Sequence, residues 1–443
     1  MTRVRVIGGG LAGCEAALQC ARAGVQVTLH EMRPRHRTPA HRTDRLGELV
    51  CSNSFKTTDV QNAHGLLKAE LQRLSCSLLE IAGESRIPAG AALGVDRERF
   101  AAAVTERVDA ERRIEVVREE RTEIDPDEIT IVATGPLTSE TLTQRIETIL
   151  GAERLAFYDA ISPIVAADSL REGRWWAASR YGKGGDDYVN CPLDEATYEA
   201  FVDGLREADP YPIQAFERTM FFEGCLPIEE MARRGRDTLR FGPLKPVGLV
   251  DPRTGARPHA VLQLRRENVE ATMLNLVGCQ TRLRYGDQRR VFGLVPALAD
   301  AEFLRYGQVH RNTFLRHPAA LDRFGRPREG WPTLLFAGQL TGVEGYVESI
   351  MSGLLAGWNV VRLDRGEEPT LPPRETMIGG LCHYLRTADP DGFQPMNANF
   401  GLLPEPAPGH RDKHLRRRAQ VELALDAIEA WAAENDPALA EVG

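Results

Sequence analysis

The feature that most constrains the fold lies within the first 31 residues. The apolar run Val4–Ile7 leads into a glycine-rich turn, an alanine- and leucine-rich segment ending at Gly24, and a second apolar run ending at Glu31. This order predicts a strand, a tight turn, a helix and a parallel strand. Glycines at the first, third and sixth turn positions allow the turn, a close approach to a pyrophosphate, and tight packing of the helix on the sheet. We therefore expect a dinucleotide on Gly8, Gly9, Gly10, Leu11, Ala12, Gly13 and Glu31.

Two later segments decide which dinucleotide is expected. Ile131–Gly135 and Thr333–Gln339 each read as an apolar strand that runs into a glycine, and they resemble the strand-end motifs of flavoproteins that bind two dinucleotides. An S-adenosylmethionine site normally has an acid just before its glycines, where this chain has Ile7. The sequence therefore indicates FAD, with Gly135, Gly338 and Gln339 as further contacts; Gln339 stands where the flavoprotein motif has aspartate.

Composition excludes several classes of protein. No run reaches the roughly 18 apolar residues of a membrane span, and the N-terminal residues enter a strand without a signal-peptide pattern, so we expect a cytoplasmic protein without membrane contact. The 8 cysteines include no pair with CxxC spacing, which argues against a zinc ribbon and a paired-cysteine redox site. We expect free thiols and no metal centre.

The net charge of −8 hides a basic segment. Residues 231–290 hold 13 Arg and Lys against 5 Asp and Glu, a balance of +8 that leaves −16 for the rest of the chain. A basic face on an acidic protein suggests a polyanionic partner, although solvated surface charge explains such a run about as well. The densest cations, which we expect to meet nucleic-acid phosphates, are Arg282, Arg284, Arg289 and Arg290.

Five long motifs carry a family resemblance. Residues 336–349, 48–54, 181–188, 221–229 and 240–249 resemble the TrmFO branch of the TrmFO/GidA group of flavin-dependent tRNA-uridine modification enzymes, and the similarity runs from residue 3 to about residue 430. The resemblance implies an enzyme that makes 5-methyluridine at position 54 of the tRNA T-loop. It also implies FAD, 5,10-methylenetetrahydrofolate as carbon donor, and NADPH or NADH as electron donor, with tRNA and folate as the expected partners. No obligate protein partner is evident.

The methylation implied by the resemblance requires a nucleophile and a base. C5 of uracil is a weak nucleophile, and addition of a thiolate at C6 makes it enolate-like. Two cysteines lie in family motifs, and Cys51 and Cys225 remain equal candidates for this attack. Cys225 precedes an expected helix, Ile228–Arg234, whose dipole and Arg233 favour a thiolate. Glu344, Tyr346 and Glu348 crowd one turn, and they are the candidates for removal of the C5 proton.

These observations predict an α/β chain in which a Rossmann-like FAD-binding domain is split by an inserted α+β domain. We expect its first part over residues 1–160, the inserted domain with the basic segment over 161–330, and its second part, ending in a helix, over 331–443. The alternatives are a GidA-like enzyme acting on the wobble uridine, an NAD(P)H-flavin reductase without RNA, and a non-catalytic flavin-bound RNA-binding protein. Methylation of tRNA by the purified protein separates them.

Overall fold

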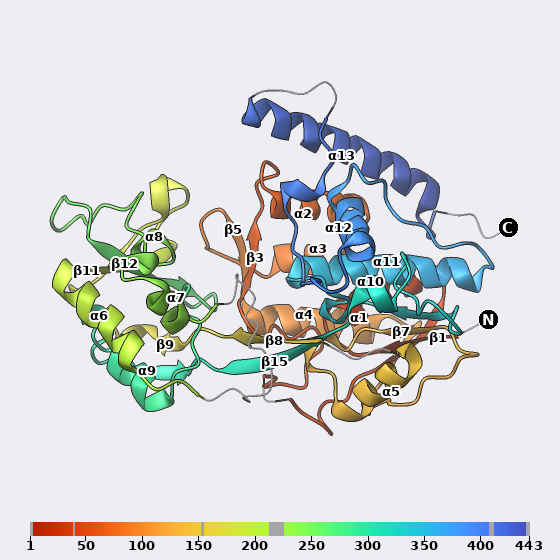
Figure 1. Ribbon diagram of the computed structural model, residues 1–443, viewed down its shortest axis with the longest axis horizontal. Helices are drawn as coiled ribbons and strands as arrows, with labels where there is room; N and C mark the ends of the chain where they lie inside the picture. The colour runs from red at the N-terminus through yellow and green to blue at the C-terminus, as the bar shows by residue number, and fades with distance from the viewer. Residues whose placement is uncertain (1–2, 39, 152–154, 212–225, 407–411, 440–443) are drawn as a thin grey trace.

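The computed structural model describes residues 3–38, 40–151, 155–211, 226–406 and 412–439. Figure 1 shows two lobes joined by a narrow ribbon, with the first and the last described helices, α1 and α13, in the larger lobe. Within the described residues no helix is long and apolar enough to cross a membrane. The same residues contain no group of three or more His, Cys, Asp or Glu that could hold a metal ion.

The larger lobe is built on a parallel sheet of five strands in the order β16-β7-β1-β2-β6. The central strand β1 has an alternating apolar pattern whose valines are fully buried. The parallel order with β1 between β2 and β7 confirms the predicted Rossmann-like α/β fold. The strands are β1 (Arg3–Ile7), β2 (Gln26–His30), β6 (Ile114–Val117), β7 (Thr130–Val132) and β16 (Leu334–Phe336).

Helices cover this sheet, and α1 packs tightly against α11. Small residues explain the close approach, because a β-carbon added at Gly353 of α11 would lie 2.2 Å from the carbonyl oxygen of Ala12 in α1. The helices of this lobe are α1 (Leu11–Arg22), α2 (Ala63–Arg73), α3 (Ser77–Glu84), α4 (Arg97–Ala110), α5 (Glu140–Leu150), α10 (His317–Ala320), α11 (Tyr346–Asp364), α12 (Met377–Thr387) and α13 (Lys413–Asn435). A small antiparallel sheet adds β3 (Ser54–Thr57), β4 (Arg86–Ile87) and β5 (Ala92–Val95).

The smaller lobe has its own sheet and its own core. Six strands pair in the order β10-β11-β12-β13-β9-β14, and apolar side chains from this sheet and from α6, α7 and α9 form a separate buried cluster. Its strands are β9 (Ile164–Ala166), β10 (Trp176–Ala177), β11 (Tyr188–Leu193), β12 (Ala260–Arg266), β13 (Met273–Leu276) and β14 (Phe303–Arg305). Its helices are α6 (Glu195–Glu207), α7 (Ile228–Arg234), α8 (Thr238–Phe241) and α9 (Tyr285–Phe292).

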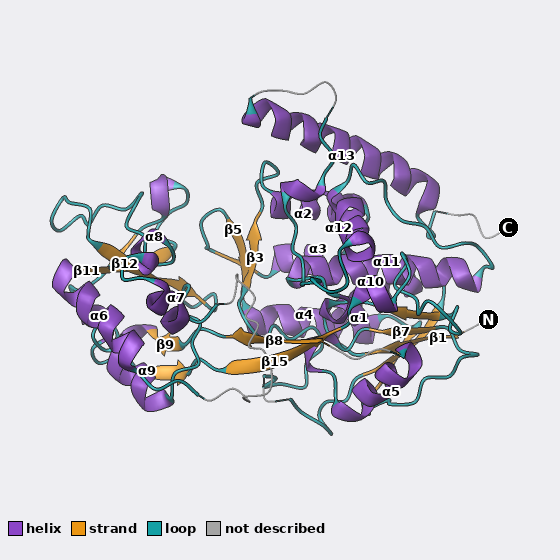
Figure 2. Cartoon of the chain, in the orientation of Figure 1, coloured by secondary structure: helices purple, strands orange, loops and turns teal. Residues whose placement is uncertain are grey.

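Two long strands connect the lobes. β8 (Leu155–Ala160) leads into the smaller lobe and pairs antiparallel with β15 (Val309–Phe314), which leads back (Figure 2). Residues after β15 rejoin the larger lobe, because Leu315 and Leu321 pack in one buried cluster with Ile7 and Val132. Some residues after β15 therefore pack with the larger lobe, and the expected boundary at residue 330 stays a prediction.

Candidate functional site

The glycine turn after β1 has the conformation that its sequence predicts. Gly8 has a φ of 109°, in the region that favours glycine, and its N–H donates to the carbonyl of His30 at 2.8 Å. A β-carbon added at Gly13 would lie 1.8 Å from the carbonyl oxygen of Gly8, so this contact requires glycine. Leu11 and Ala12 begin α1 directly above the turn.

Gly10 leaves room for a ligand. A β-carbon added there would meet no protein atom within 4 Å, although the residue stands at the N-terminus of α1. That helix start has no side-chain cap, so its first N–H groups are available to an anion. An open approach and uncapped N–H groups are what a pyrophosphate needs, and these residues therefore fit a dinucleotide.

The turn opens into a cleft at the carboxyl ends of three neighbouring strands. The cleft contains about 540 Å³ of space and is lined by Gly8, Gly9, Gly10, His30, Glu31 and Thr134. These residues follow β1, β2 and β7, at the point where the strand order reverses. Open parallel sheets bind their ligands at such a switch point. Gly135 and Gly338 lie at the ends of β7 and β16 on the same edge, and Gly338 approaches Ala12 closely enough to disfavour a side chain.

Glu31 is fixed by an arginine that the sequence analysis did not single out. Its carboxylate accepts from the N–H of Gly9 at 3.0 Å and from Nε of Arg33 at 2.8 Å. Burial by itself raises the carboxyl pKa, but the hydrogen bonds and charge of Arg33 outweigh it, and the pKa of Glu31 lies below its ordinary value. The carboxylate stays ionised and lines the cleft, as ribose recognition requires.

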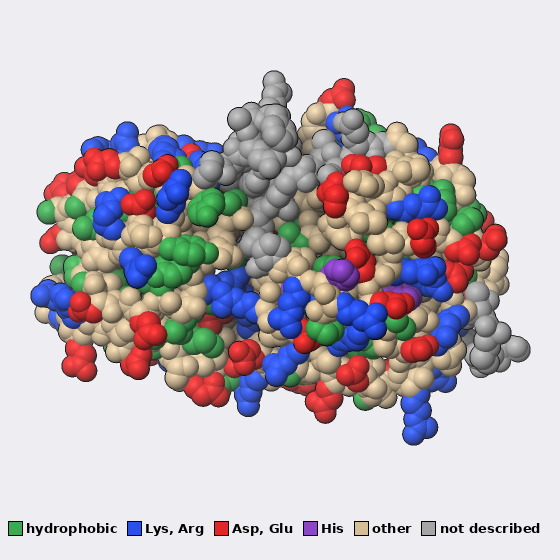
Figure 3. Space-filling model, turned by 90° about the horizontal axis from the view of Figure 1, so that it is seen from below, with side chains coloured by type: hydrophobic (Ala, Val, Ile, Leu, Met, Phe, Trp, Pro, Cys, Tyr) green, Lys and Arg blue, Asp and Glu red, His purple; other side chains and the backbone are tan. Residues whose placement is uncertain are grey.

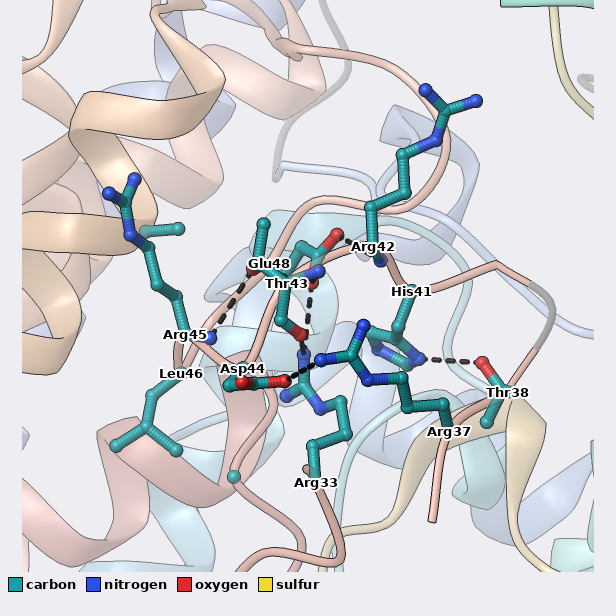
Figure 4. Close-up of polar contacts among 12 residues, drawn as sticks. Arg33, Arg37, Thr38, His41, Arg42, Thr43, Asp44, Arg45, Leu46 and Glu48 are labelled. Carbon is teal, nitrogen blue, oxygen red and sulfur yellow. Dashed lines mark hydrogen bonds and ion pairs between the residues drawn. The ribbon is translucent and has the colours of Figure 1, made fainter. Parts of the chain in front are cut away.

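A basic loop runs from this glutamate toward Cys51. Residues 33–45 contain 5 arginines and 2 histidines against one aspartate, a local signal that the sequence analysis passed over. Figure 4 shows Arg33, Thr43 and Glu48 turned toward one another, whereas Arg42 and Arg45 extend away. The Glu48 carboxylate accepts from Nη1 of Arg33 at 3.0 Å and from the N–H of Arg42 at 2.8 Å. Glu48 therefore links the glycine-turn side of the loop to the Cys51 segment.

The structure brings Cys51 and Tyr346 together, two candidates that are far apart in the chain. The Tyr346 hydroxyl oxygen accepts a hydrogen bond from the Cys51 N–H at 2.9 Å. Glu344 lies in the preceding turn, 8% exposed, and accepts from Nε2 of Gln339 at 2.6 Å. In the sequence Cys51, Tyr346 and Glu344 are separate candidates, and only the fold shows which of them touch.

Three arginines hold the segment around Cys51. The carbonyl of Cys51 accepts from Arg97 at 3.0 Å, and the carbonyl of Val50 accepts from Arg305 at 2.8 Å. Arg265 donates to the side chains of Ser52 and Asn53 at 2.9 and 2.8 Å. Arg265 and Arg305 come from the smaller lobe, so the Cys51 segment is the joint between the lobes. Burial lowers the pKa of Arg305 to about 10.

A cavity of about 430 Å³ lies beside Cys51 at this joint. We call it the Cys51 cavity; its lining includes Cys51, Ser162, Arg265, Asn275 and Gln280. Cys225, the other candidate nucleophile, lies outside the described residues. The expected helix after it is confirmed as α7, but Arg233 is paired with Glu230 at 2.8 Å and is not a free cation.

The predicted tRNA-contacting arginines differ in their surroundings. The Arg282 side chain is 14% exposed and paired with Glu230, and its N–H donates to Glu229, so its charge is already compensated. Arg284 and Arg290 are exposed but pair with Asp209 and Asp287. Arg289 is exposed and lies over the ring of Tyr306. Glu230 and Asp209, which lie outside residues 231–290, thus pair with Arg282 and Arg284. Basic and acidic side chains are interspersed in Figure 3.

The third acid-base candidate, Glu348, is buried among other charged groups. Glu348 in α11 is 1% exposed, with one carboxylate oxygen 3.3 Å from Nδ1 of His64 and another hydrogen bond from the N–H of Ala398. Burial raises its pKa, but His64 and Lys56 outweigh this, and the pKa of Glu348 is below its ordinary value. Lys68 is also buried, and burial lowers its pKa to about 8. The contact between Glu348 and His64 joins α11 to α2.

Comparison with known proteins agrees with this arrangement. The family model described as glucose inhibited division protein A matches residues 3–368. Among solved structures, GidA from Aquifex aeolicus aligns with a TM-score of 0.72 and 16% identity, covering 99% of this chain and 74% of that one, and so shares the fold.

Curated relatives are far more similar to this chain in sequence than the solved GidA structure is. A protein of Geobacter sulfurreducens named methylenetetrahydrofolate–tRNA-(uracil-5-)-methyltransferase TrmFO is 54% identical over 431 residues, which cover 97% of this chain and 99% of that protein. One of the same name from Koribacter versatilis is 52% identical and covers 98% of each chain. With a glycine-turn cleft, a cysteine at the joint between two lobes, and this identity over nearly its whole length, the chain belongs to the TrmFO family within the GidA-related flavoproteins.

Proposed function

We propose that this chain transfers the methylene carbon of 5,10-methylenetetrahydrofolate to C5 of the T-loop uridine at position 54 of tRNA and reduces it to a methyl group. Uridine, methylenetetrahydrofolate, NAD(P)H and a proton then give 5-methyluridine, tetrahydrofolate and NAD(P)⁺. The observation that carries the proposal is Cys51, held beside a polar cavity at the joint of a dinucleotide-binding lobe and an inserted lobe. Relatives that are 50–54% identical carry the name of this activity.

FAD is the cofactor that the glycine-turn cleft accommodates. Gly8–Gly13, the N-terminus of α1 and Glu31 would hold its pyrophosphate and ribose. Bound there, FAD supplies hydride chemistry between NAD(P)H and the one-carbon unit.

The residues around Cys51 have separate roles. A thiolate, from Cys51 or Cys225, adds to C6 of the uracil so that C5 becomes nucleophilic. Tyr346 accepts from the Cys51 N–H and Arg97 donates to the Cys51 carbonyl, and these two contacts set the backbone on either side of the thiol. Once C5 carries the new carbon, its proton leaves to Tyr346 or Glu344 and the cysteine is eliminated.

The polyanionic substrate requires contacts with phosphates. Arg284, Arg289 and Arg290 remain exposed on the inserted lobe, and the basic loop adds Arg42 and Arg45 on the larger lobe. Cations on both sides of the joint would support an RNA arm that spans it. Because tRNA is modified where it is used, we place the reaction in the cytoplasm.

Reconstitution tests this proposal. Purified protein loaded with FAD is incubated with 5,10-methylenetetrahydrofolate, NADPH and unmodified tRNA transcript, and the nucleosides are separated by mass spectrometry. We expect 5-methyluridine, lost when folate is omitted. Product at the wobble uridine, or flavin reduction without any RNA product, would instead support one of the alternative functions.

A further inference from the structure

The Cys51 cavity contains a buried amide that the protein leaves without a partner. Asn275 is 5% exposed, yet its side chain makes no hydrogen bond within the described residues. It lies on β13 between β9 and β12, so both flanking strands fix its backbone. Its amide atoms are not among the fully enclosed polar atoms that lack a partner, so the amide opens to the cavity. A side chain kept in that state at a cavity wall points to a ligand that completes its hydrogen bonds.

The same cavity holds a cation with no acid beside it. Arg265 is directly opposite Asn275 on β12, is 8% exposed, and donates to the neutral side chains of Ser52 and Asn53. Within the described residues it has no ion pair with a carboxylate, and the lining of the cavity includes no Asp or Glu. Arg305 stands behind the Cys51 segment, also buried, with its Nε unbonded in the described part of the chain. The cavity therefore favours electron-rich oxygens.

The hydrogen-bond donors and acceptors that line the Cys51 cavity match one edge of a pyrimidine base. Uracil presents O4, N3–H and O2 along one edge, in the order acceptor, donor, acceptor. The amide of Asn275 offers one donor and one acceptor in a fixed plane, and Arg265 adds donors for a carbonyl oxygen.

We propose that the Cys51 cavity receives the extruded target uracil and that Asn275 reads its N3–H and O4 edge, with Arg265 facing a ring carbonyl. This inference rests on the proposed function, because it takes the substrate to be a uridine in RNA. It adds the residue that selects the base. Enzymes that act on a base extrude it and recognise its pairing edge by such hydrogen bonds.

The test uses three T-arm RNA hairpins that share all phosphates and differ at the target nucleotide: uridine, cytidine and an abasic ribose. Dissociation constants are measured with the FAD-loaded wild type and with Asn275→Ala. The wild type should prefer uridine to the abasic RNA by about 10- to 100-fold, the range typical of lost hydrogen bonds to a base edge. In Asn275→Ala the uridine RNA should weaken to near the abasic value, and the abasic RNA should bind as before.

The control is Asn190→Ala, another buried asparagine in the same sheet. Its amide donates to the carbonyl of Ala178 at 3.0 Å and its oxygen accepts from Gln263 at 2.8 Å, so this change should lower thermal stability and leave the uridine preference intact. An unchanged uridine-to-abasic ratio in Asn275→Ala overturns the inference. An equal loss on all three RNAs also overturns it, since it marks a phosphate contact. Failure of the wild type to methylate any RNA counts against the proposed function instead.

Discussion

Substitution of Gly10 should weaken ligand binding, whereas substitution of Gly13, three residues later in the same turn, should destabilise the fold. Gly10 has a φ of −81° and extended ψ, which valine adopts without strain, and no protein atom lies within 4 Å of an added β-carbon. Gly13 has no such freedom, because its added β-carbon would overlap the Gly8 carbonyl oxygen at 1.8 Å. Gly10→Val therefore tests whether a ligand binds at this turn, and Gly13→Ala tests how much the packing of the helix on the strand contributes to stability.

The magnitudes follow from these distances. Gly10→Val should lower the free energy of unfolding of the apoprotein by about 1 kcal/mol, the cost of a β-branched residue at a helix N-cap. Because its side chain enters the space of the pyrophosphate, the dissociation constant for FAD should rise about 100-fold or more, equivalent to about 3 kcal/mol. Gly13→Ala should destabilise the apoprotein itself by about 3 kcal/mol, since strand and helix must separate.

The assay combines flavin titration with unfolding of the apoproteins. Flavin content is measured by visible absorbance after purification, and the free energy of unfolding by denaturant titration without flavin. We expect Gly10→Val to be colourless and folded, and Gly13→Ala to be destabilised before any flavin is added. A folded Gly10→Val protein that retains wild-type flavin would refute the assignment of this turn to FAD.

Three further predictions follow from particular contacts. Either Cys51→Ala or Cys225→Ala should abolish covalent trapping of 5-fluorouridine-containing tRNA while FAD stays bound; trapping that survives both changes together would exclude the thiolate mechanism. Burial lowers the pKa of His317 to about 4, so its contribution to stability is complete above about pH 6.5 and is lost as the pH falls toward 4. Relative to His317→Gln, the wild type should lose about 3 kcal/mol of unfolding free energy across this window, measured by urea titration; parallel curves would contradict the neutral buried form. Alanine at the three exposed arginines of the inserted lobe should reduce the slope of log affinity for tRNA against log salt by about one per lost phosphate contact. If the slope is unchanged, Arg284, Arg289 and Arg290 are excluded as phosphate contacts.

The part of the site that was predictable from sequence is the part that local geometry determines. A strand, a turn with three glycines, and a helix lie within 22 residues, and each glycine has a reason that is visible along the chain. Glu31 follows in the next strand at a fixed distance. Backbone constraints of this kind act between neighbours, so the FAD cleft could be assembled without knowing the rest of the fold.

The remainder depends on pairing between distant segments. Asn275 and Arg265 line a cavity only because β12 and β13 pair and because the Cys51 segment packs against them, more than 200 residues away in sequence. The charge count of residues 231–290 likewise could not reveal that Arg282 is paired, because its partner Glu230 lies 52 residues earlier. Composition reports which charges exist, and tertiary packing decides which of them remain available.

The most direct test of the proposed reaction follows the carbon and its hydrogens. The FAD-loaded enzyme is given unmodified tRNA, NADPH, and methylenetetrahydrofolate carrying two deuterium atoms on its methylene group. A carbon that arrives as methylene and is then reduced must yield 5-methyluridine in which the methyl group retains both deuterium atoms and gains one hydrogen from the reductant. We expect that doubly labelled nucleoside by mass spectrometry. An unlabelled methyl group, or one formed without folate, would contradict the account.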